Sequence, residues 1–275
     1  MLPIKKQFQG SKVITLYPGM TPTIKKVLAY GVHLFTASGT LFGLAAIFLI
    51  DKADYQLAFV AMFAAIIIDA VDGTLARLFD VKNVIKGIDG ATLDNIVDFF
   101  NYSMVPCFFL MRTDLIAEPY KFVCIASIAL ASCYQFAQTD AKTEDHFFKG
   151  FPSYWNIVVF YEYYWQLSSA VSVAAILFLS FLSFVPIKFV YPSRLEHASK
   201  SKLIRILIFV ATVVWGIDTI ALIATYPKPV PILNGLSIAY VVFYAGFSVD
   251  RTYSPLKLKK SLQKGLAHIQ SRRKK

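Results

Sequence analysis

The sequence has few charged residues for its length, and few of the residues that build zinc sites or disulfide frameworks. Of its 275 residues, 16% are charged, 3 are cysteine and 4 are histidine. Soluble domains carry about a quarter charged residues, so this composition argues against a soluble globular protein. The cysteines show no CxxC spacing and the histidines are scattered, which excludes a recognisable zinc or disulfide pattern.

Apolar residues are abundant, and they are concentrated in long runs. The chain is 56% hydrophobic with a mean hydropathy of +0.55, and about 20 apolar residues suffice to cross a bilayer. The first residues are too polar for the core of a signal peptide. We therefore predict an all-α, polytopic membrane helical bundle of about eight transmembrane helices, with a short or tilted helix among the fifth and sixth. The predicted spans are 28–50, 55–78, 91–112, 119–138, 154–168, 170–189, 203–226 and 231–249.

Basic residues predict the topology and the domain limits. They gather before the first span, in the 79–90 loop, between the sixth and seventh spans and after Asp250, and such residues favour the cytoplasmic side. Eight spans place all of these segments, and both termini, in the cytoplasm. We expect a cytoplasmic or interfacial segment over 1–27, a transmembrane domain over 28–250 and a basic cytoplasmic tail over 251–275.

The net charge of +11 fits the same arrangement. It comes without any nucleic-acid-binding motif, so we expect no nucleic-acid partner and assign the basic charge to anionic membrane lipids.

Acidic residues cluster where the second and third spans meet the cytoplasm. Asp69 and Asp72 lie three residues apart, and Asp94 and Asp98 lie four apart, so each pair shares one helix face. Ionised carboxylates in apolar surroundings must pair, protonate or bind a metal. Oxygen ligands without histidine or cysteine favour Mg²⁺, Mn²⁺ or Ca²⁺, and four carboxylates suffice for two ions. Asp80 and Asp89 stand outside this pattern, and Asp89 is placed to cap the third span.

Other interpretations of the same residues are a proton relay, an ion pathway or, for the small residues, helix packing. A divalent-cation transporter is the alternative from another functional class. Such a protein typically shows internal repeats, and we find none.

The stretch "DAVDGTLAR…GATLDNIVD" resembles the signature of the CDP-alcohol phosphotransferase family, DxxDGxxAR…GxxxDxxxD. All of its fixed positions are matched, by Asp69, Asp72, Gly73, Ala76, Arg77, Gly90, Asp94 and Asp98. The gap between Arg77 and Gly90 is longer than in most of the family. It resembles the branch of bacterial phosphatidylcholine synthases, as do "HLFTASGTLFGL" at 33–44 and "DHFFKGFPSYWN" at 145–156.

The resemblance implies a membrane enzyme of the bacterial inner membrane with a cytoplasmic-side active site. Asp69, Asp72, Asp94 and Asp98 would hold Mn²⁺ or Mg²⁺, and Asp98 would also act as the general base. Asp69, Gly73, Ala76, Arg77 and Gly90 would bind the nucleotide of CDP-diacylglycerol. The acceptor would be choline, the by-product CMP and the assembly a homodimer. An amino-acid acceptor, as in phosphatidylserine synthases, is the alternative within the family, with Lys149 or Arg194 as the extra basic residue.

Candidate contacts to choline come from aromatic and polar residues near the signature, since aromatic faces attract quaternary ammonium groups. Interface belts also use aromatic residues, so each of these positions has a packing alternative. Arg194 is a candidate for a lipid phosphate, or an anchor at the inner surface. The predicted choline contacts are Tyr102, Tyr154, Trp155, Asn156 and Glu162.

Overall fold

The computed structural model describes residues 19–141, 143, 147–191, 199 and 201–253. The described part of the chain is mostly helical, as predicted, and its two short strands pair antiparallel with Phe148 opposite Phe189. The elements are α1 (Pro22–Asp51), α2 (Tyr55–Leu78), α3 (Val81–Val84), α4 (Gly90–Phe99), η1 (Phe100–Met104), α5 (Val105–Arg112), α6 (Glu118–Ala137), β1 (Phe147–Lys149), α7 (Trp155–Tyr164), α8 (Ser169–Leu182), β2 (Lys188–Val190), α9 (Lys202–Thr225) and α10 (Pro231–Tyr253).

Side-chain caps begin several helices where the sequence changes from polar to apolar. The Asp54 carboxylate accepts a hydrogen bond from the Leu57 amide at 3.2 Å at the start of α2. The Asp89 carboxylate accepts one from the Ala91 amide at 3.1 Å at the start of α4, which confirms the predicted cap. Because a cap satisfies an otherwise unpaired amide, these residues define where the helices begin.

Among the described residues, 5 helices are long and apolar enough to cross a membrane. They are α1, α2, α6, α9 and α10. The predicted span 91–112 is one helical run that is interrupted by the π-helical turn η1 between α4 and α5. The polytopic helical architecture is therefore confirmed.

The fifth and sixth spans differ from the prediction. Helix α7 has 10 residues and α8 has 14, so both are short rather than one alone. The predicted sixth span continued to 189, but α8 ends at Leu182 and residues 188–190 form β2. Pro186 separates the two, because it has no amide hydrogen and cannot continue a helix.

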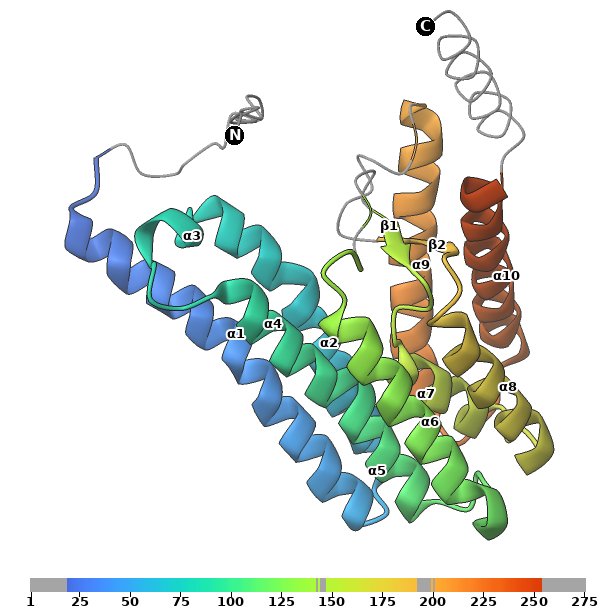
Figure 1. Cartoon of the computed structure of the whole chain (residues 1–275). Coiled ribbons are helices and arrows are strands. Elements are labelled where there is room, and N and C mark those ends of the chain that lie inside the picture. Colours follow the sequence, from blue (N-terminus) through green and yellow to red (C-terminus); the bar gives the residue numbers. More distant parts are fainter. Residues whose placement is uncertain (1–18, 142, 144–146, 192–198, 200, 254–275) are drawn as a thin grey trace, which may run out of the picture.

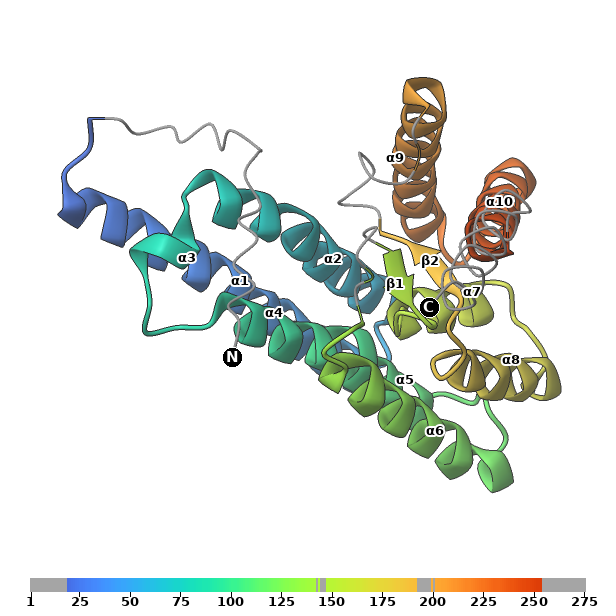
Figure 2. The same ribbon diagram turned by 45° about the horizontal axis from the view of Figure 1, so that its top comes forward.

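The helices lie in two groups that enclose a core rich in aromatic side chains. Helices α1, α2, α4, α5 and α6 run side by side, while α9 and α10 stand together on the other side of α7 (Figures 1 and 2). The core between them includes the buried side chains of Phe59, Phe109, Trp155 and Phe160. The outer faces are apolar, with Leu34 72% and Phe122 79% exposed, as lipid-facing surfaces require.

Parts of the predicted end segments lie outside the described residues. These are most of the amino-terminal segment and the tail from 254 onward. Arg194, the candidate contact to a lipid phosphate, is not among the described residues either. The domain limits therefore stay predictions.

Candidate active site

Three of the four predicted metal-binding carboxylates meet between α2 and α4. One oxygen each of Asp69, Asp94 and Asp98 lies within 4.8 Å of the other two, and all three residues are partly buried. Asp72 lies one turn along α2, is buried at 5% exposure and is not part of this three-carboxylate group. Two helices thus bring together acidic side chains that would be costly to bury without a cation.

The three-carboxylate group offers only hard oxygen donors. Magnesium, manganese and calcium prefer such donors, so the residues present fit a divalent cation of this kind.

The glycines of the signature lie against polar side chains from other positions. A Cβ at Gly73 would approach Nη1 of Arg77 to 3.4 Å, so the Arg77 side chain lies along this face of α2. A Cβ at Gly90 would lie 3.2 Å from Cε1 of His33 on α1. His33 is 8% exposed, and its Nε2 has no hydrogen-bond partner among the described residues. His33 was not predicted as a site residue, although it lies in the stretch 33–44.

Asp89 caps the start of α4 and is not part of the three-carboxylate group. Its carboxylate accepts hydrogen bonds from the Thr92 hydroxyl at 2.8 Å and the Ala91 amide, and these bonds lower the pKa of Asp89. Because Asp94 and Asp98 follow on the same helix, the cap helps to orient both.

The π-helical turn η1 orients Tyr102. A π turn adds a residue to the α-helical repeat and is common at functional sites. Tyr102 is buried, and its hydroxyl donates a hydrogen bond of 2.7 Å to Oδ2 of Asp69. The sequence predicts Tyr102 beside Asp98 on one helix. The structure adds its hydrogen bond to the Asp69 carboxylate on α2.

Glycines on α1 let the π turn pack closely. The Asn101 side chain donates a hydrogen bond of 3.1 Å to the carbonyl of Gly39. A Cβ at Gly43 would overlap both Asn101 and the ring of Phe100. Small residues at such positions allow helix backbones to approach, and here they fix the segment that carries Tyr102.

An aromatic wall continues from Tyr102 toward the two strands. We use this name for Tyr102, Tyr154, Phe148 and Tyr191, whose successive ring centroids are 6.0, 6.2 and 4.5 Å apart. Phe148 belongs to β1, and Tyr191 directly follows β2. Neither Phe148 nor Tyr191 was predicted as a site residue, since their position depends on strand pairing between distant segments.

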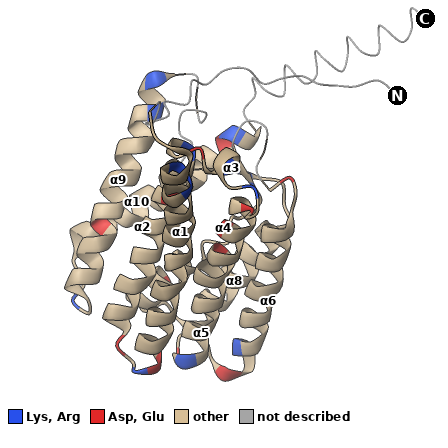
Figure 3. Ribbon diagram, turned by 90° about the vertical axis from the view of Figure 1, so that its left-hand side faces the viewer, with Lys and Arg blue, Asp and Glu red and all other residues tan. Residues whose placement is uncertain are grey.

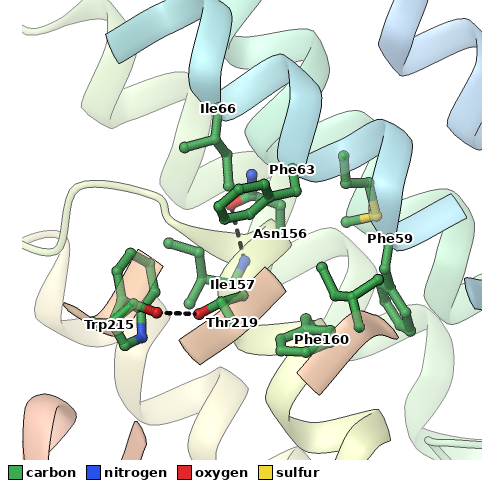
Figure 4. Close-up of a pocket in the computed structure, with 10 residues that line it drawn as sticks. Phe59, Phe63, Ile66, Asn156, Ile157, Phe160, Trp215 and Thr219 are labelled. Carbon is green, nitrogen blue, oxygen red and sulfur yellow. Dashed lines mark hydrogen bonds between the residues drawn. The ribbon is translucent and has the colours of Figure 1, made fainter. Parts of the chain in front are cut away.

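The other predicted choline contacts lie on α7. The indole of Trp155 is fully buried and donates a hydrogen bond of 3.0 Å to Ser132 on α6. Asn156 accepts a hydrogen bond from the Ile157 amide at 2.9 Å and lines a cavity of about 20 Å³ between α2, α7 and α9 (Figure 4). Glu162 is buried, and neither carboxylate oxygen has a partner among the described residues. Their roles stay predictions.

The chain is similar to known phosphatidyltransferases. The profile of the CDP-alcohol phosphatidyltransferase family matches residues 32–226. A phosphatidylcholine synthase of Legionella pneumophila is 44% identical over 83% of this chain and 90% of its own length. Those of Borreliella burgdorferi and Pseudomonas aeruginosa are 40% and 33% identical, over 72% and 85% of this chain and 87% and 95% of their own lengths. The chain therefore belongs to the CDP-alcohol phosphatidyltransferase family.

Proposed function

We propose that this protein is a phosphatidylcholine synthase, which transfers the phosphatidyl group of CDP-diacylglycerol to choline and releases CMP. The observation that carries the proposal is the three-carboxylate group with an aromatic wall beside it. The relatives named above as phosphatidylcholine synthases support the choice of acceptor.

Asp69, Asp72, Asp94 and Asp98 would hold Mn²⁺ or Mg²⁺ as one or two ions. When bound, the cation neutralises the pyrophosphate charge and polarises the phosphorus that bears the lipid. Gly73, Ala76 and Gly90 would leave room for the nucleotide, with Arg77 beside its negative charge. His33, which lies against Gly90, supplies a further polar group for the nucleotide.

Asp98 would accept the proton of the choline hydroxyl. The hydroxyl oxygen then forms a bond to the lipid-bearing phosphorus, and the bond from that phosphorus to the oxygen of CMP breaks. Tyr102 would position Asp69 through its hydrogen bond. The ring faces of Tyr102, Tyr154 and Phe148 would hold the trimethylammonium group, because quaternary ammonium ions bind aromatic faces.

Lys149 bears on the choice between choline and an amino acid as acceptor. Its Nζ lies 2.6 Å from Oδ2 of Asp140, and this hydrogen bond raises the pKa of Lys149. A lysine whose charge is already paired is a weaker partner for the carboxylate of an amino acid. The pairing favours choline over serine.

The distribution of charge supports a cytoplasmic site at an inner membrane. Basic side chains are more numerous at the end of the bundle that carries α3 than at the other end, and acidic side chains lie at both ends (Figure 3). Positive charge favours the cytoplasmic side, so the three-carboxylate group and both termini would face the cytoplasm. The family resemblance also implies a homodimer. The molecular mass of the purified protein in solution would test this assembly.

The test is incorporation of labelled choline or labelled serine into lipid by membranes that contain the protein, with CDP-diacylglycerol and Mn²⁺. We expect choline to be incorporated, CMP to appear in equal amount and chelation of the metal to stop both. Asp98→Asn should abolish turnover and leave CDP-diacylglycerol binding largely intact. Metal-dependent incorporation of serine alone would refute the proposed acceptor.

A further inference from the structure

A second cavity, of about 410 Å³, opens at the end of the bundle opposite the three-carboxylate group. Its volume falls within the range of about 300–1,000 Å³ that small-ligand sites occupy. Tyr55 begins α2 and lies fourteen residues before Asp69, or about 21 Å at the helical rise per residue. The cavity is lined by Tyr55, Arg112, Thr113, Asp114, Leu115, Tyr163, Gln166, Leu167 and Tyr226.

Three tyrosines form one side of this outer cavity. The ring centroids of Tyr55 and Tyr163 are 5.1 Å apart, and those of Tyr163 and Tyr226 are 6.1 Å apart. Tyrosines are common at membrane interfaces and alone would indicate only an anchoring belt. These three instead line a cavity, in which their faces can attract a cation.

Charges of both signs stand beside the tyrosines. Asp114 is exposed and makes no ion pair among the described residues, so its negative charge is available to a ligand. Arg112 pairs with Asp51 at 2.8 Å through one nitrogen, and a guanidinium has further donors for a phosphate. The cavity thus offers one ligand the anionic group of Asp114 and the remaining hydrogen-bond donors of the Arg112 guanidinium.

Gln166, at the end of α7, adds a polar side chain to the lining of the cavity. Helix α7 ends in a Schellman motif, in which the Leu167 amide bonds to the Glu162 carbonyl and the Gln166 amide to that of Tyr163. Gln166 occupies the left-handed position, with φ at 50°, where glycine is the usual residue. The motif directs the Gln166 side chain to the wall of the cavity, which it lines.

We propose that the outer cavity binds a choline-phosphate group. The tyrosine faces and Asp114 would hold the trimethylammonium, and Arg112 the phosphate, with the Gln166 amide as a further polar contact. The group belongs to a phosphatidylcholine headgroup or to soluble phosphocholine. No residue of the three-carboxylate group takes part, so this inference does not depend on the proposed function.

The test is calorimetric titration of the full-length protein, in nanodiscs without choline lipids, with phosphocholine, dihexanoylphosphatidylcholine and choline chloride. Chelator in the buffer suppresses binding at the three-carboxylate group. We expect saturable binding of the first two probes. Tighter binding of the lipid would identify a headgroup site, and equal binding would identify a soluble ligand. If choline alone binds as well as phosphocholine, the phosphate contact is wrong.

Two variants distinguish an effect on ligand binding from an effect on the stability of the fold. Asp114→Asn should weaken binding at least fivefold. Gln166→Gly should also weaken it without lowering the unfolding temperature, because glycine suits the left-handed position. The matched control is Glu118→Gln, an exposed carboxylate near the same end that is paired with Lys121 and does not line the cavity. Absence of saturable binding, or unchanged binding in both cavity variants, would overturn the proposal. Choline incorporation, measured separately, reports on the proposed function alone.

Discussion

The hydroxyl of Tyr102 and the carboxylate of Asp69 form a hydrogen bond of 2.7 Å between the π turn after α4 and the first signature residue on α2. The bond connects the two helices that supply the three-carboxylate group. Groups that orient a metal ligand often change metal affinity or activity by about 10–100-fold when removed.

Tyr102→Phe should therefore lower turnover by about tenfold or more and raise the Mn²⁺ concentration needed for half-maximal activity. The ring remains, so the KM for choline should change little. Turnover at a series of metal concentrations measures both effects. Tyr134→Phe, in an exposed ring that packs on Phe184, is the control. A change confined to the choline KM would contradict a role for Tyr102 in positioning Asp69.

Tyr154→Leu and Phe148→Leu should each raise the KM for choline while the KM for CDP-diacylglycerol stays near its original value. A cation–π contact contributes about 0.5–2 kcal/mol, which corresponds to roughly a 2–30-fold change. Steady-state kinetics with each substrate varied in turn separates the two constants. Equal changes in both KM values would show that the aromatic wall supports the site as a whole.

His33→Phe should raise the KM for CDP-diacylglycerol by about tenfold, the value of a hydrogen bond to a charged group. The same change removes a buried nitrogen without a partner among the described residues, so the protein without substrate should unfold at an equal or higher temperature. A lower unfolding temperature with an unchanged KM would identify His33 as a packing residue.

Gly43→Ala should destabilise the protein by about 1–3 kcal/mol, the usual effect of overpacking, because a Cβ there overlaps Asn101 and Phe100. Gly31→Ala is the control on the same helix. No other atom lies within 4 Å of a Cβ at that position, and alanine is the better helix former by about 0.5–1 kcal/mol. Thermal unfolding in detergent should move in opposite directions for the two variants.

Asp89→Ala should lower the unfolding temperature at neutral pH, because the cap of α4 is lost. The Thr92 hydroxyl and Ala91 amide lower the pKa of Asp89 below its ordinary value of 3.8. The stabilisation is therefore complete above the unfolded-state pKa and is lost as the pH falls through the lower folded-state pKa. The difference between wild type and variant should shrink below pH 3.8, as unfolding over a pH series will show. A difference that persists at the lowest pH would assign the effect to something other than the ionised cap.

The sequence by itself determined the helical membrane architecture and the positions of the signature residues. Long apolar runs require helices in a bilayer, and the spacing of Asp94 and Asp98 places both on one helix face. Residues close in sequence are related by the helical repeat alone, so these predictions needed no tertiary information. The caps at Asp54 and Asp89 follow from equally local chemistry.

Only the tertiary structure decided which residues pack around the helix faces that carry the signature carboxylates. The close approach at Gly43, the π turn that directs Tyr102 to Asp69 and the contact of His33 with Gly90 all depend on how α1, α2 and α4 pack. Phe148 and Tyr191 reach the aromatic wall because β1 pairs with β2 across a long separation in sequence. Side-chain periodicity defines the faces of each helix, but the partner of each face is selected by packing among distant segments.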